Sequence, residues 1–225
     1  MGPEIWKALP KSERARLKRL TLLESQARLN GYRCVAGVDE AGRGPLAGPV
    51  FAAACAIPAG IFFPGINDSK LLSAPKRQAL FELITTHPAV AYGISSVDHE
   101  TIDRINIHQA SLEAMRGAVA ALAGKLKEKP DYVLVDGVNL TLSGIVTERV
   151  IHGDHLSQMI AAASIVAKQT RDQLMTQFHS QYPEYGFDEH KGYGTPRHMA
   201  ALEKYGPCPI HRRSFAPVSQ TLIPH

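Results

Sequence analysis

The chain has 225 residues, with 25 Lys and Arg against 21 Asp and Glu, a formal net charge of +4 and 44% hydrophobic residues. This length and composition suit one globular domain with a small appendage and exclude a disordered, collagen-like or coiled-coil chain. The charge is uneven, because residues 1–33 hold eight basic and three acidic residues and residues 190–225 hold five and one, which leaves twelve basic and seventeen acidic residues between them. We therefore expect an acidic body between two basic ends, and an anionic partner.

The N-terminal segment, residues 1–33, is predicted to form a basic helical arm. Ser12 is expected to cap a helix that runs to about Asn30, because apolar residues recur at spacings of three and four from Leu17 to Ala27. A glycine directly after Asn30 is a typical helix end.

Residues 34–180 alternate apolar runs with helical patterns, which predicts a body of the α/β class built on a mixed sheet. The uncharged stretch 44–67 is long enough to suggest a membrane span, but four prolines and four glycines interrupt it. We therefore expect a buried strand and a loop there, and no membrane contact. The expected strands are 34–39, 50–57, 90–97, 132–136 and 144–151, and the expected helices are 73–86, 98–104, 106–123 and 156–178.

The tail, residues 181–225, is broken by prolines and glycines, with aromatic and basic residues between them. This pattern predicts a lobe of loops and short helices placed against the sheet, without an obvious core of its own. The three cysteines, Cys34, Cys55 and Cys208, are far apart and form no C-x-x-C pair. Together with the absence of an apolar leader, this favours free thiols and a cytoplasmic protein.

Acidic residues end two of the expected strands and precede the last long helix. Asp39 and Glu40 end the first strand, Asp136 ends the fourth, and Asp154 lies just before the helix. Buried carboxylates are costly unless a cation compensates them, and oxygen ligands without a Cys/His cluster select Mg²⁺ or Mn²⁺. Converging carboxylates therefore predict a site for two ions, an arrangement used for displacement at phosphorus.

The sequence leaves a structural interpretation open for each acid. Asp154 taken alone could cap the following helix, and Asp136 taken alone could be a turn residue before Gly137. The pleat of a strand raises a further difficulty, because Asp39 and Glu40 point to opposite faces unless the backbone bends at Glu40.

A short glycine segment, Gly42-Arg43-Gly44, follows the acidic pair. Glycines allow a ligand to approach the backbone closely, and the Arg43 guanidinium can form paired hydrogen bonds with a phosphate. The spacing matches neither G-x-x-x-x-G-K-[ST] nor G-x-G-x-x-G. A plain turn with a solvated arginine is the alternative, so the position beside the two acids is what indicates a function.

Several longer segments form a recognisable pattern. They are Val38-Asp-Glu-Ala-Gly-Arg-Gly-Pro-Leu-Ala-Gly-Pro-Val50, Asp68-Ser-Lys70, Val135-Asp-Gly137, Gly153-Asp154, Ile160-Ala-Ala-Ala-Ser-Ile-Val-Ala-Lys168, Thr170-Arg-Asp172 and His190-Lys-Gly-Tyr-Gly-Thr195. Together they resemble bacterial ribonuclease HII, the type 2 ribonuclease H. The resemblance covers about residues 34–216, in order and without large gaps.

The resemblance implies a ribonuclease H-like mixed sheet flanked by helices, with a C-terminal helical lobe. It implies that the four metal-binding carboxylates are those of Asp39, Glu40, Asp136 and Asp154. It further implies that Gly42, Arg43 and Gly44 contact the ribonucleotide and its phosphate, that Lys70 contacts a phosphate, and that Tyr193 packs on the sugar at an RNA–DNA junction.

The implied reaction is endonucleolytic hydrolysis of RNA in an RNA/DNA hybrid, including cleavage 5′ to a single ribonucleotide in duplex DNA. Two metal ions would take part, and the products would carry 3′-hydroxyl and 5′-phosphate ends. The expected partner is nucleic acid, a replication clamp is a further candidate, and the chain is expected to be a monomer.

Two alternatives to this activity follow from the same residues. A catalytically silent protein that binds RNA/DNA hybrids would keep the basic ends without needing all four acids, and another nuclease could share the fold. The sequence also departs from the family, because His152 and His155 flank Asp154 where Lys and a small residue are common. Their effect on the site, and the choice between Mg²⁺ and Mn²⁺, stay open.

Overall fold

The computed structural model describes residues 3–221, and its centre is a mixed five-stranded sheet in the order β3-β2-β1-β4-β5. Strands β1, β2 and β3 are antiparallel neighbours, whereas β1, β4 and β5 run parallel to one another. The predicted α/β class is confirmed. The strands are β1 (Val35–Ala41), β2 (Val50–Ala56), β3 (Ala91–Val97), β4 (Tyr132–Asp136) and β5 (Val146–Val150).

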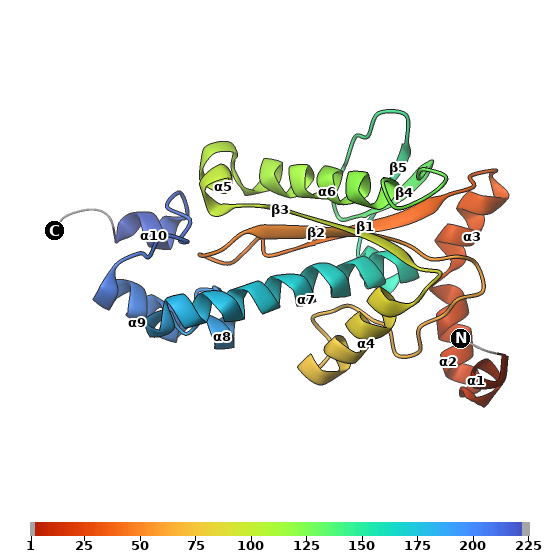
Figure 1. Ribbon diagram of the computed structural model, residues 1–225, viewed down its shortest axis with the longest axis horizontal. Helices are drawn as coiled ribbons and strands as arrows, with labels where there is room; N and C mark the ends of the chain where they lie inside the picture. The colour runs from red at the N-terminus through yellow and green to blue at the C-terminus, as the bar shows by residue number, and fades with distance from the viewer. Residues whose placement is uncertain (1–2, 222–225) are drawn as a thin grey trace.

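Helices cover both faces of the sheet, and each face has its own hydrophobic core (Figure 1). Side chains alternate along β1, so that Ala36 and Val38 lie in one core and Val35 lies in the other. The first core is closed by α5 (His99–Ile105) and α6 (Ile107–Ala123), and the second by α4 (Ala74–Thr86) and α7 (Gln158–Gln181).

Helix α7 lies unusually close to β1, and a glycine permits this approach. A Cβ atom added to Gly37 would lie 2.5 Å from the backbone nitrogen of Ile160 and 2.6 Å from the carbonyl carbon of Met159. Both obstacles are backbone atoms, so neither a rotamer change nor a small side-chain shift could make room. The start of α7 is thereby held against the strand that carries Asp39 and Glu40.

We expect Gly37→Ala to lower the free energy of unfolding by about 3 kcal/mol, because the added methyl group forces α7 away from β1. The matched control is Gly124→Ala, since Gly124 has an ordinary φ of −67° and its Cβ would meet no atom closer than 3.7 Å. Urea unfolding should leave the control within about 0.5 kcal/mol of the parent. Equal losses in the two variants would contradict the close approach.

The N-terminal segment forms three short helices, so the prediction of one helix from Ser12 to Asn30 is wrong. Ser12 caps nothing, because α2 begins at Lys11 with Pro10 before it and without a side-chain cap. The break falls at Leu20, whose carbonyl accepts a hydrogen bond of 2.7 Å from the backbone N–H of Gln158. The break lets residues of both α2 and α3 reach the core beside α7. The helices are α1 (Pro3–Ala8), α2 (Lys11–Arg19) and α3 (Leu22–Leu29).

The C-terminal lobe has a small hydrophobic cluster, which corrects the expectation of a tail without an obvious core. Tyr185, Phe187 and Leu202 are buried in it, and the body contributes Leu46 and Met175. The lobe lies at the opposite end of the molecule from α1–α3, so the two basic ends flank the sheet (Figure 1). Its helices are η2 (Pro183–Tyr185), α8 (Phe187–His190), α9 (Pro196–Tyr205) and α10 (Ala216–Gln220).

Within residues 3–221, no helix is both long and apolar enough to cross a bilayer. The three cysteines are free, as predicted.

Candidate active site

The topology brings the acidic ends of two strands together. The parallel pairing of β1 with β4 places Val38 beside Val135, so Asp39 and Asp136 follow at the same level of the sheet. Asp136 is the last residue of β4, and Asp39 is buried near the end of β1. We refer to Asp39, Glu40, Asp136 and Asp154 together as the acidic group. The ends of two neighbouring parallel strands therefore account for the positions of Asp39 and Asp136 within it.

Asp154 joins this group through a short 3-10 helix, η1 (Gly153–His155). The backbone N–H of Gly153 donates a hydrogen bond of 2.6 Å to Oδ1 of Asp136, which ties η1 to the end of β4. Asp136 does precede a glycine turn, since Gly137 has a φ of +62°. Its side chain nevertheless reaches η1 rather than its own turn.

The role of helix cap falls to Ser157 and not to Asp154. The Ser157 hydroxyl accepts a hydrogen bond from the Ile160 N–H at 3.1 Å, and α7 starts at Gln158. The same hydroxyl donates to Oε1 of Glu24 at 2.7 Å, and the Met159 N–H donates to that oxygen at 3.2 Å. Glu24 is fully buried, so the N-terminal arm fixes the segment that presents Asp154.

Burial and mutual repulsion make the site unfavourable for carboxylates alone. Burial, reinforced by the charges of Glu40 and Asp136, raises the pKa of Asp39 well above its ordinary value. Burial also raises the pKa of Glu40, although Arg43 opposes the change, and it raises the pKa of Asp154, with the charges of Asp68 and Asp136 adding to the effect. A cation bound among these groups would reverse the balance.

Among the described residues of this site, one fully buried carboxylate oxygen has no hydrogen-bond partner. Oε1 of Glu40 accepts from Nη1 of Arg43 at 3.3 Å, but Oε2 is buried without a hydrogen bond. A buried oxygen of this kind is costly unless an ion or water satisfies it. An orphaned oxygen within an all-oxygen donor set is what a hard divalent cation would require, so these residues fit such an ion.

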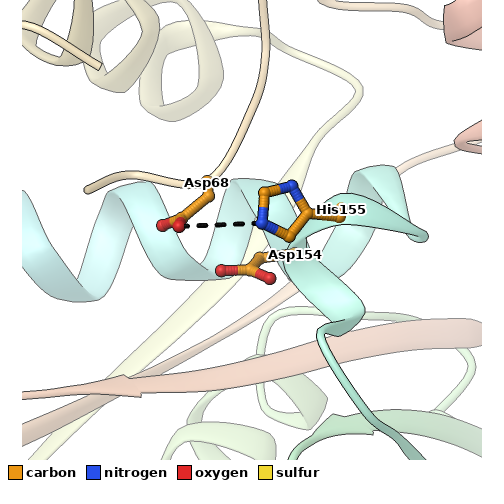
Figure 2. A group of neighbouring side chains, drawn as sticks. All are labelled: Asp68, Asp154 and His155. Carbon is orange, nitrogen blue, oxygen red and sulfur yellow. Dashed lines mark ion pairs between the residues drawn. The ribbon is translucent and has the colours of Figure 1, made fainter. Parts of the chain in front are cut away.

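A second cluster shares Asp154 and adds two residues, Asp68 and His155, that the sequence did not single out as ligands. Among the described residues, Asp68, Asp154 and His155 have possible ligand atoms that all lie within 4.8 Å of one another. Figure 2 shows the three side chains gathered at the start of α7, with Nε2 of His155 3.9 Å from Oδ2 of Asp68. The Asp68-Ser-Lys70 segment carries the sequence signal for Asp68, although the resemblance implies a role for Lys70 alone in this segment.

Lys70 is anchored beside this cluster. Its backbone N–H donates to Oδ1 of Asp68 at 2.9 Å. Burial alone would lower the pKa of Lys70, but the carboxylates of Asp68 and Asp39 outweigh it and raise the pKa. Lys70 therefore stays cationic beside the acidic group, as a phosphate contact requires.

The glycine loop and Tyr193 meet, although they are far apart in sequence. A Cβ atom added to Gly44 would lie 3.5 Å from Cε1 of Tyr193, so the aromatic ring lies directly over the loop. Gly42 has a φ of +98°, a conformation that favours glycine. The exposed Tyr193 ring and the partly exposed Arg43 are both free to meet a ligand at this surface.

Two buried arginines hold this loop, and sequence reasoning missed both. Arg212 donates to the carbonyls of Gly42, Arg43 and Gly48 at 2.6, 2.9 and 2.9 Å. Arg171 donates to those of Ala47, Pro49 and Lys191 at 3.1, 3.0 and 3.0 Å. Burial lowers the pKa of Arg171 to about 10 and that of Arg212 to about 9. Nothing in the residues around them distinguishes such arginines from solvated ones.

Comparisons with known proteins show which sequences and structures this chain resembles. The sequence model described as Ribonuclease HII matches residues 36–218. A Ribonuclease HII from Chlamydia muridarum is 52% identical over 202 residues, which is 90% of this chain and 91% of that relative. The ribonuclease H2 structure from Pyrococcus horikoshii is similar with a TM-score of 0.67 and 28% identity, over 84% of this chain and 97% of that one.

A further solved structure, the PCNA:RNase HII complex from Archaeoglobus fulgidus, has a TM-score of 0.66 and 23% identity. It covers 80% of this chain and 94% of that chain, and at this identity it supports the fold alone.

Proposed function

The chain belongs to the ribonuclease HII family and is a type 2 ribonuclease H endonuclease, and from this premise we propose that it cleaves 5′ to ribonucleotides embedded in duplex DNA as well as within RNA/DNA hybrids. The products would carry 3′-hydroxyl and 5′-phosphate ends. The observation that carries the proposal is the convergence of Asp39, Glu40, Asp136 and Asp154, with one Glu40 oxygen unpartnered, beside a loop that Tyr193 overlies.

These four carboxylates would hold two divalent cations, Mg²⁺ or Mn²⁺. When bound, such ions supply Lewis-acid charge that stabilises the reacting phosphate and the leaving 3′ oxygen. The protein's own contribution is to hold the four carboxylates in place. The link from Gly153 to Asp136 fixes η1, and the close packing at Gly37 fixes α7.

Other residues would position the nucleic acid. Arg43 and Lys70 would contact phosphates, since both are cations at the edge of the acidic group. The backbone of Gly42 and Gly44 can approach the sugar closely, and the Tyr193 ring would pack on it. Detection of the 2′-hydroxyl by this loop would distinguish RNA from DNA at the junction.

Both ends of the chain would help to bind nucleic acid. A basic arm (1–33) and a C-terminal lobe (181–225) would flank the catalytic body (34–180). Helices α1–α3 and α8–α10 lie at opposite ends of the sheet (Figure 1), which suits a duplex longer than the site itself. A replication clamp is proposed as a protein partner, on the parallel of the archaeal complex that contains PCNA. The chain would act as a monomer.

The proposal is tested by cleavage of three matched duplexes: one with a single ribonucleotide, one RNA/DNA hybrid and one of DNA alone. With Mg²⁺ or Mn²⁺ we expect cleavage of the first two, 5′ to the ribonucleotide in the first, and none of the third. Asp136→Asn should lose about a thousandfold in rate, because Asn keeps the acceptor for Gly153 but removes the charge that holds a cation. Equal rates in parent and variant would refute the metal assignment.

The two alternatives predict other outcomes of the same assay. A silent binding protein would retain the hybrid without cutting it. A different nuclease on the same fold would cut the DNA duplex, or would ignore the position of the ribonucleotide.

A further inference from the structure

Two buried histidines in the C-terminal lobe are joined directly. His198 of α9 and His211, which follows α9, are 0% and 1% exposed, and their Nε2 atoms lie 2.9 Å apart. Only one of the two nitrogens can carry the proton of this hydrogen bond, because two N–H groups would repel and two lone pairs could not bond. Its direction is fixed by what the other ring nitrogens contact.

The outer contacts assign every proton. Nδ1 of His198 lies 2.9 Å from the Tyr193 carbonyl, which can only accept, so this Nδ1 carries a proton and a neutral His198 offers a lone pair at Nε2. Nε2 of His211 must then carry the proton between the rings. Nδ1 of His211 accordingly accepts from the Cys208 N–H at 3.0 Å and does not donate to the Cys208 carbonyl, which is 3.3 Å away.

We propose that His198 and His211 are positioning residues for substrate recognition: their hydrogen bonds run from Cys208 through both rings to the Tyr193 carbonyl and fix the Tyr193 ring over the glycine loop. The proposal rests on the proposed function, in which Tyr193 contacts the sugar at the junction. The series needs both rings neutral, and burial supports this by lowering the pKa of each histidine to about 4.

A third histidine, His190, also holds the segment that carries Tyr193. His190 accepts a hydrogen bond from the Gly192 N–H at 3.2 Å through Nδ1, so its Nε2 donates to the Tyr185 carbonyl at 2.7 Å. Its ring stacks on that of His198, with centroids 4.7 Å apart. The Gly192 carbonyl in turn accepts from the Leu46 N–H at 2.8 Å, which joins the segment to the chain just after the glycine loop.

Two substitutions at one position separate positioning from packing. His198→Asn keeps an N–H donor near the place of Nδ1, and so keeps the bond to the Tyr193 carbonyl, but no longer reaches His211. His198→Gln reaches toward His211 but offers no donor to that carbonyl. Both remove an aromatic ring from the same core, so a merely structural role would affect them alike.

The main readout is cleavage of a duplex with one ribonucleotide, measured as kcat and KM. At temperatures where both variants are folded, we expect His198→Gln to lose about tenfold in kcat/KM and His198→Asn about twofold, because only Gln removes the donor that holds the Tyr193 carbonyl and so misplaces the Tyr193 ring. In a Tyr193→Ala background the loss from His198→Gln should disappear. Equal losses in the two variants, or a loss that persists without Tyr193, would overturn the proposal.

Two further results keep the causes apart. Nitrogen NMR of the imidazoles should show His198 protonated at Nδ1 and His211 at Nε2, and the opposite tautomers would also overturn the proposal. If Tyr193→Ala alone leaves junction cleavage unchanged, the role of Tyr193 in the proposed function is wrong, and the positioning proposal falls with it. If Tyr193→Ala is harmful but His198→Gln is not, only the positioning proposal fails.

Discussion

Asp39→Asn should give a protein that is more stable without metal than its parent and almost inactive with it. At neutral pH the ionised Asp39 carboxylate lowers the stability of the metal-free parent, since burial and the charges of Glu40 and Asp136 raise the pKa of Asp39. Asn supplies the neutral form and keeps the oxygen that accepts from the Glu40 N–H. We expect the metal-free variant to gain about 1 kcal/mol and to lose about a thousandfold in cleavage rate.

Thermal unfolding in EDTA, and then with Mg²⁺ or Mn²⁺, measures both effects. The parent should be stabilised by the ion and the variant much less, because only a cation that binds the folded state raises stability. The metal-free parent should also lose stability as pH rises from the ordinary pKa of an aspartate through the raised one, a slope that Asp39→Asn should flatten.

A matched control is Asp98→Asn, which changes a cap at the start of α5. Asn is as good a cap as Asp, so its stability and activity should stay near those of the parent. A less stable Asp39→Asn in EDTA would show that the carboxylate is already compensated without metal.

Arg212→Met should be the most damaging substitution outside the acidic group. It removes three hydrogen bonds to the carbonyls of Gly42, Arg43 and Gly48, which are then buried without donors. We expect a loss of about 3–5 kcal/mol in unfolding free energy. Cleavage should fall by about a hundredfold at temperatures where the variant is folded, because the loop that carries Arg43 loses its fixed shape.

The neighbouring Arg213 provides the comparison, since Arg213→Met removes the same charge from an exposed side chain. Its backbone N–H, which donates to Asp103, is unaffected. Urea unfolding should place this control within about 0.5 kcal/mol of the parent. If the two variants weaken substrate binding equally, charge rather than loop shape is the property that matters.

The acidic group was predictable in outline because it depends on local patterns and one topological rule. Asp39 and Asp136 each end an apolar run, and parallel neighbours place such ends together. The position of Glu40 was not predictable, because the alternation of a strand places it on the opposite face from Asp39. In the structure both charges still act on each other, and Glu40 also meets Arg43 just beyond the strand.

The parts that sequence reasoning missed depend on contacts between distant segments. Arg171 and Arg212 are buried by contacts that no local pattern reveals. Arg212 donates to carbonyls of the distant loop 42–48, and Arg171 donates to carbonyls of that region and of Lys191. The break at Leu20 likewise reflects a bond to Gln158 rather than any helix-ending residue. Apolar periodicity indicates which face of a helix is buried, but it does not show where a tertiary contact interrupts the helix.

The central position of β1 affects the order in which the sheet assembles during synthesis. During synthesis β1 can pair with β2, and β2 with β3, at an early stage. The parallel partner of β1, β4, does not begin until Tyr132, and closing so long a loop is slow. Asp136 and Asp154 therefore join Asp39 and Glu40 only after most of the chain has emerged from the ribosome. A nascent chain therefore holds no assembled acidic group, and the repulsion among these acids arises only when the fold is almost complete.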